Sequence, residues 1–155
     1  MIQRIQSLFL FLAFGSAIAV FFFPLASLLG EFYYVKLTVL EVAEQAQYGM
    51  QWPNSLPLAA VMGLTGLLSF ITIFIYKNRT AQMRLIRFSI LLNVVFLALI
   101  FFYYVPELES MVETTADYVS EIGIYLSIIP LIFLVLALRF IRKDEKLVRA
   151  ADRLR

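Results

Sequence analysis

Four long stretches with almost no charged side chains dominate the pattern of hydrophobic and polar positions along the chain. They cover residues 5–26, 57–76, 88–105 and 118–138. Each stretch is apolar on all sides, whereas a surface helix of a soluble domain is apolar along one stripe. Roughly 20 apolar residues cross the hydrocarbon core of a bilayer. The pattern therefore predicts an all-α membrane protein, a four-transmembrane-helix bundle forming a single integral membrane domain over residues 1–155.

The basic residues are segregated between the connecting segments. Twelve of the 13 Lys and Arg residues lie before the first stretch, between the second and third, or after the fourth; the exception is Lys36. Short cytoplasmic segments are enriched in Lys and Arg. We therefore expect both termini, an inner loop at 77–87 and a basic tail helix at 139–155 to be cytoplasmic, with outer loops at 27–56 and 106–117. This pattern is typical of a multi-pass membrane protein with both termini in the cytoplasm.

A cleaved signal peptide is the alternative interpretation of the N-terminal segment. Residues 1–19 offer a basic start, an apolar stretch and small residues at Ala17 and Ala19. The apolar stretch continues through Val20–Phe23, beyond the length of a typical signal core. This continuation favours a retained helix.

The first outer loop contains a segment with the composition of a strand. Tyr33–Leu40 is rich in β-branched and aromatic residues, and Tyr48–Trp52 is a candidate partner across a polar turn. An isolated hairpin is marginal in water. A small β-hairpin here would therefore lie on the outer ends of the helices, either as a partner-binding lid or as a structural plug.

The second outer loop has helical periodicity. Apolar residues from Leu108 to Ile122 recur at helical spacing, and Pro106 suits the first turn of a helix. Such a helix would carry four acids along one face, namely Glu109, Glu113, Asp117 and Glu121. They form either a stripe for a cation or a basic partner, or a solvated face. We expect no metal site, because a straight helix cannot wrap oxygen ligands around an ion.

The residue pattern of the tail at 139–155 predicts a basic amphipathic helix with Phe140 and Leu147 on its apolar face. Its candidate contacts with anionic lipid headgroups or a protein partner are Arg142, Lys143, Lys146 and Arg149. The alternative is a topology anchor with a solvated face. Nucleic acid is not expected as a ligand, because no aromatic residue follows Phe140 to stack on bases.

Within the apolar stretches, Asn93 is a primary amide that needs a hydrogen-bond partner in hydrocarbon. We expect it to bond across to a neighbouring helix, with substrate contact as the alternative. Three small-residue pairs at helical spacing predict close packing of the first two helices: Ala13 with Ala17, Gly15 with Ala19, and Ala59 with Gly63, followed one turn later by Gly66. A kink is expected in the fourth helix from Gly123 and Pro130.

Composition narrows the candidate chemistry. The chain is 62% hydrophobic and has neither Cys nor His, which excludes disulfides, thiolate nucleophiles and imidazole-based catalysis. We expect no cofactor and no enzyme; catalysis by outer carboxylates would require two acids such as Glu44 and Glu113 to converge. The favoured function is a structural or accessory subunit that binds lipid, a protein partner or a second copy of itself. The alternative is a small transporter or channel component acting as an oligomer.

The two ends of the chain carry a family resemblance. Met1–Ser7, Ile141–Arg149 and Ala151–Arg155 resemble the ends of an uncharacterised Gram-negative bacterial family of short four-span inner-membrane proteins, classed as a domain of unknown function. The resemblance implies an inner-membrane location and no established activity, so no catalytic residues are carried over. The layout is also similar to claudin-like tetraspan proteins, with both termini inside and an extended first outer loop. The loop cysteines of those proteins are absent here, and the loop is shorter.

Overall fold

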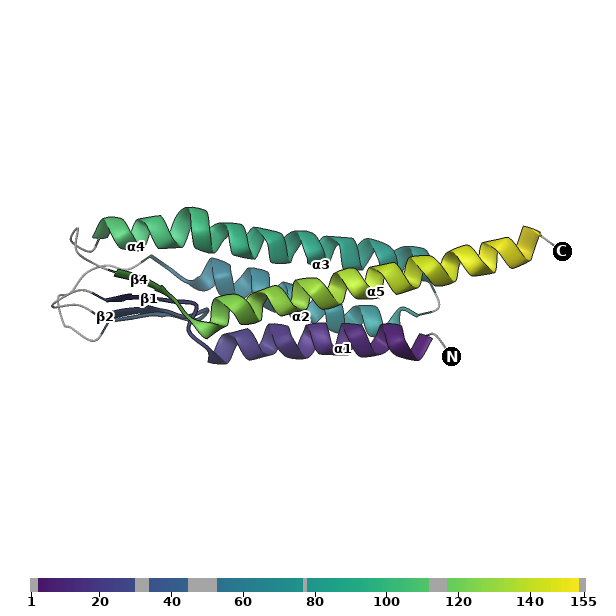
Figure 1. The fold of residues 1–155 in the computed structure, drawn as a ribbon, viewed down its shortest axis with the longest axis horizontal. Coiled ribbons are helices and arrows are strands. Elements are labelled where there is room, and N and C mark those ends of the chain that lie inside the picture. Colours follow the sequence, from purple (N-terminus) through teal and green to yellow (C-terminus); the bar gives the residue numbers. More distant parts are fainter. Residues whose placement is uncertain (1–2, 30–33, 45–52, 77, 112–116, 154–155) are drawn as a thin grey trace.

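Four long helices lying side by side form the frame of the protein (Figure 1). The structure, a computed structural model, describes residues 3–29, 34–44, 53–76, 78–111 and 117–153. The helices are α1 (Gln3–Ala19), α2 (Leu56–Phe74), α3 (Arg79–Leu99) and α5 (Ile122–Arg153). Within the described residues, four helical stretches are long and apolar enough to cross a membrane. The predicted set of four long apolar helices is thus confirmed.

Small residues bring α1 and α2 close together. A Cβ atom built on Gly66 would lie 3.5 Å from the Cβ of Ala17, an ordinary van der Waals contact, so the two backbones pack closely there. Gly15 has nothing within 4 Å of such an atom, so its predicted role in this interface is wrong. α1 also packs along α5, and α3 contacts both α2 and α5, which closes the bundle.

The third helix is longer than predicted and runs through Pro106. α3 continues through a π-helical turn, η2 (Ile100–Tyr104), into α4 (Val105–Met111). The composite of 33 residues is about 50 Å long at 1.5 Å per residue, against about 30 Å of hydrocarbon. In η2 the amide of Val105 donates to the carbonyl of Ile100. The π-turn ends at Tyr104, two residues before Pro106, whose ring nitrogen cannot donate a helical hydrogen bond. The predicted helix start at this proline is therefore wrong.

A four-stranded antiparallel sheet caps the end of the bundle opposite the termini (Figure 1). Its strands are β1 (Ala26–Leu29), β2 (Tyr34–Leu37), β3 (Val42–Glu44) and β4 (Asp117–Ser120), in the order β3-β2-β1-β4. β1 is central, with Ser27 opposite both Lys36 of β2 and Val119 of β4. β2 falls inside the predicted strand, whereas the predicted partner at 48–52 lies outside the described residues.

The sheet corrects two expectations. The residues of β1 were placed at the end of the first apolar stretch and the start of the outer loop. Those of β4 were placed on a helix running from Pro106 to Ile122, and this helix is wrong, because 117–120 is a strand. Tyr118 and Val119 favour a strand by composition. Pairing with β1 satisfies backbone groups that a helix would have bonded internally.

The buried core has two apolar clusters at different depths. The one nearer the sheet joins strand residues such as Leu28 and Leu37 to Tyr104 and Leu108 of the long composite helix. The one nearer the termini joins α1, α3 and α5, and its members include Leu10, Met83, Ile86, Leu134 and Ile141. The outer part of the composite helix therefore anchors the sheet, while the other cluster holds the helices together near the termini.

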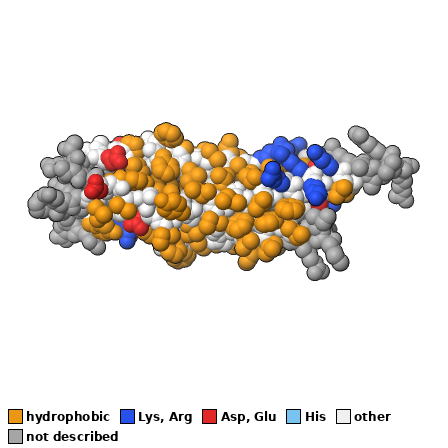
Figure 2. All heavy atoms as spheres, in the orientation of Figure 1, with side chains coloured by type: hydrophobic (Ala, Val, Ile, Leu, Met, Phe, Trp, Pro, Cys, Tyr) orange, Lys and Arg blue, Asp and Glu red, His pale blue; other side chains and the backbone are white. Residues whose placement is uncertain are grey.

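Charge is distributed along the long axis. Figure 2 shows Asp and Glu near the sheet, Lys and Arg toward the termini, and apolar side chains across the face between them. We call these the sheet end (β1–β4 and α4) and the basic end (the start of α1, the α2–α3 turn and the last turns of α5). Large apolar side chains are exposed between the ends; Phe22 is 77% and Phe102 is 85% exposed. A surface of this kind is usually covered by lipid or by another protein.

Candidate functional site: a basic pocket between two helices

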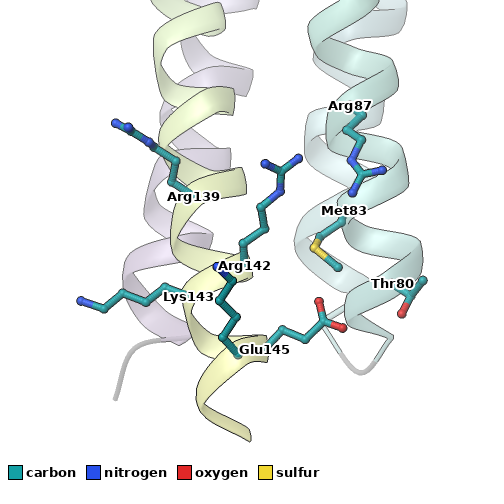
Figure 3. A pocket seen from close by; sticks show the side chains of 8 residues that line it. Thr80, Met83, Arg87, Arg139, Arg142, Lys143 and Glu145 are labelled. Carbon is teal, nitrogen blue, oxygen red and sulfur yellow. The ribbon is translucent and has the colours of Figure 1, made fainter. Parts of the chain in front are cut away.

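A pocket of about 610 Å³ lies between α3 and α5 at the basic end (Figure 3). Its lining residues are Thr80, Met83, Arg87, Arg139, Arg142, Lys143, Glu145 and Lys146. Three of the predicted tail contacts, Arg142, Lys143 and Lys146, are among them. The side chain of the fourth, Arg149, lies outside the described part of the chain.

Two helices position the cations of the pocket. α3 begins at a cap in which the Asn78 side chain accepts a hydrogen bond of 3.1 Å from the Ala81 amide. This start fixes the helix turns that carry Arg87. α5 continues as one helix past the end of its apolar stretch and carries Arg142 alongside α3. Arg87 and Arg142 point toward each other across the pocket (Figure 3).

The electrostatics of the pocket favour an anion. Five of its lining side chains are basic and one, Glu145, is acidic. Like charges facing each other repel, and an anion placed between them removes this repulsion. A guanidinium group matches phosphate or carboxylate oxygens through two parallel hydrogen bonds.

A buried carboxylate lies near the pocket. Asp144 is 7% exposed, and its Oδ2 accepts a hydrogen bond from Nε2 of the buried Gln6 of α1. Its Oδ1 has no hydrogen-bond partner among the described residues. Sequence reasoning missed this contact because it considered lipid, a protein partner or solvent around the tail, and not packing of the tail against the first helix. The signal was present, however, since Asp144 continues the buried helical stripe of Ala137 and Ile141.

The predicted acidic stripe is not formed on one helix. Glu109 lies exposed on α4, Asp117 lies exposed on β4, and Glu113 is outside the described residues. Glu121 follows β4, where its Oε1 accepts a hydrogen bond of 2.9 Å from Ser27 Oγ. Within the described residues, no three acids are grouped to hold a metal ion. The convergence of Glu44 and Glu113 concerns side chains outside the described part of the chain.

Near these acids, Tyr118 is a polar group with an unusual environment. Its hydroxyl is buried without a hydrogen-bond partner among the described residues. Burial raises the pKa of Tyr118 above its usual value of 10.0, and the nearby Tyr125 and Glu109 act in the same direction. The phenol is therefore held in its neutral form over a wider pH range.

Asn93 lies in a polar layer between the two apolar clusters. It is fully buried, and both its amide nitrogen and its oxygen lack partners among the described residues, so the expected hydrogen bond to a neighbouring helix is absent. The other buried polar side chains of the layer are hydroxyls that bond to their own helices, namely Thr65, Ser69, Ser89 and Ser127. Asn93 is thus the unsatisfied group of this layer.

Comparison with known proteins identifies the family. A family described as Domain of unknown function (DUF4293) matches residues 2–154. The chain belongs to the DUF4293 family. No curated protein and no solved structure matches it. The expected membership of an uncharacterised family is thus confirmed, whereas the Gram-negative origin and the similarity to claudin-like proteins stay expectations. The basic pocket and the polar layer of this DUF4293 chain are therefore interpreted from its own residues.

Proposed function

We propose that this protein is a non-catalytic accessory protein of the bacterial inner membrane that binds anionic phospholipid at its cytoplasmic face. One observation carries the proposal: Arg87 and Arg142, on separate helices, point toward each other in a pocket with an excess of cations. A lipid phosphate placed between them would relieve their repulsion and accept hydrogen bonds from both.

The position of the pocket favours a lipid over a protein partner as its ligand. Apolar side chains are exposed on adjacent turns of both helices, including Phe88 and Leu91 on α3 and Val135 on α5. They offer a surface for acyl chains directly beside the cations. Basic pockets between membrane helices at the cytoplasmic side are suited to anionic headgroups.

Orientation follows from the distribution of basic residues. The start of α1, the turn between α2 and α3 and the end of α5 all lie at the basic end (Figure 1). Under the positive-inside rule this end faces the cytoplasm. The pocket then lies at the inner leaflet, which carries anionic phospholipid.

The test is lipid retention by the full-length protein purified in mild detergent and analysed by native mass spectrometry. We expect the wild type to retain anionic phospholipid and the double variant R87Q/R142Q to lose most of it. R84Q is the matched control, because Arg84 is an exposed cation of α3 outside the pocket lining. Equal retention by the wild type and the double variant would overturn the proposal.

Asn93 supports a second candidate function, a small transporter or channel component acting as an oligomer. The Asn93 amide is fully buried in the polar layer and has no hydrogen-bond partner among the described residues, so it could bind a water molecule or a polar solute. Because the chain has no Cys, N93C would place a unique thiol there. Reaction of N93C with a small hydrophilic thiol reagent in intact vesicles would support transport. A thiol that reacts only after denaturation would count against it.

A further inference from the structure

The basic pocket holds more positive charge than one phosphate can balance. Five cations and one acid line it, whereas a phosphodiester carries a single negative charge. Its volume of about 610 Å³ falls within the range of roughly 300–1,000 Å³ that is usual for sites of sizeable ligands. Both the charge and the space indicate a headgroup larger than one phosphate.

Four of the five cations around the pocket form two groups that point in different directions. Arg87 and Arg142 face each other between α3 and α5 (Figure 3). Arg139 and Lys143 lie one turn apart on α5 and point away from α3. With the side chains in these positions, a phosphate between Arg87 and Arg142 leaves the charge of Arg139 and Lys143 unbalanced.

We infer that the ligand is a phospholipid whose single headgroup carries two phosphates, as in cardiolipin. One phosphate is held between Arg87 and Arg142. The second reaches Arg139 and Lys143 around the surface of α5, and the acyl chains follow the exposed apolar side chains beside the pocket. This inference rests on the proposed function and adds the class of lipid.

The experiment measures binding to the full-length protein in neutral detergent, with cardiolipin, phosphatidylglycerol and free pyrophosphate as three separate ligands. We expect cardiolipin to bind about tenfold or more tightly than phosphatidylglycerol at equal phosphate concentration. The reason is that the second phosphate binds as part of the same molecule, at a high effective concentration. Pyrophosphate is expected to bind more weakly than either lipid.

Variants separate the two phosphate positions. R142Q should weaken both lipids, whereas R139Q/K143Q should reduce cardiolipin to the affinity of phosphatidylglycerol and leave phosphatidylglycerol unchanged. All three altered side chains are exposed, so the core is not disturbed; an unchanged melting temperature and a monodisperse elution peak check this point. R84Q again serves as the control.

The outcomes distinguish this inference from the proposed function. Equal affinity for the two lipids at equal phosphate concentration, or no effect of R139Q/K143Q on cardiolipin, would overturn the two-phosphate ligand while anionic lipid binding stands. Binding of neither lipid would overturn both. Pyrophosphate bound as tightly as cardiolipin would show that a soluble anion, and not a headgroup, is the ligand.

Discussion

The start of α5 is packed so closely against the chain before β1 that replacing Gly123 with alanine should destabilise the fold. A Cβ atom on Gly123 would lie 2.3 Å from the carbonyl oxygen of Pro24 and 2.9 Å from that of Phe23. Both are backbone atoms, so no side chain can rotate away to make room. The Gly123 amide also donates a hydrogen bond of 2.8 Å to the Pro24 carbonyl.

The expected cost follows from two effects. Inserting a methyl group into a closely packed site costs about 1–3 kcal/mol, and losing the hydrogen bond from Gly123 to Pro24 costs about 1 kcal/mol. Alanine would return about 1 kcal/mol through its higher helix propensity. We therefore expect G123A to lower the free energy of unfolding by about 1–3 kcal/mol. At this chain length that corresponds to a melting temperature lower by roughly 2–12 °C.

The melting temperature is measured in detergent by heating samples and determining, by size-exclusion chromatography, the fraction that stays folded. G15A is the matched control, because nothing lies within 4 Å of a Cβ atom at Gly15 and that helix position is exposed. It should raise the melting temperature slightly. If G123A melts at or above the wild-type temperature while G15A behaves as expected, the close approach of α5 to Pro24 is wrong.

Two further predictions concern buried polar groups. Q6L removes the partner of the buried Asp144 carboxylate and should lower stability by about 2 kcal/mol, whereas Q6L/D144L should recover most of this loss in the same melting assay. A double variant no more stable than Q6L would contradict the pairing. Because the pKa of Tyr118 is raised in the folded protein, its contribution to stability is present below about pH 10 and is lost as the pH rises through the folded pKa. Y118F should therefore shift the midpoint of alkaline unfolding to higher pH, and an unchanged midpoint would contradict the burial of this phenol.

The helices could be predicted from the sequence because a long run without charge is suited to a bilayer. In hydrocarbon its backbone polar groups must bond to one another, and a helix satisfies them within a single segment. The sheet could be predicted only in part. The segment containing β2 had the composition of a strand, but 117–120 also fitted a helical period. Its pairing with β1, about 90 residues away, decided the outcome. The helix start predicted at Pro106 was wrong because the helix continues through this proline after a π-turn, although proline usually marks a helix start.

The candidate site was predictable by composition but not by geometry. The tail cations Arg142, Lys143 and Lys146 were predicted as candidate contacts for anionic headgroups or a protein partner, and the structure places all three on the lining of the basic pocket. Arg87 was recognised only as part of a basic loop, because nothing local to α3 shows that it faces a residue of α5. The missing partner of Asn93 was equally invisible, since a buried amide is expected to find a hydrogen bond.

The most direct test of the account is the position of its two ends relative to the membrane. The chain has no Cys, so S110C at an exposed position of α4 and L147C at an exposed position of α5 would each carry a unique thiol for a membrane-impermeant maleimide. In intact cells with a permeable outer membrane, the account predicts labelling of S110C only, and labelling of L147C only after lysis. Labelling of L147C from outside, or recovery of the protein in the soluble fraction, would contradict it.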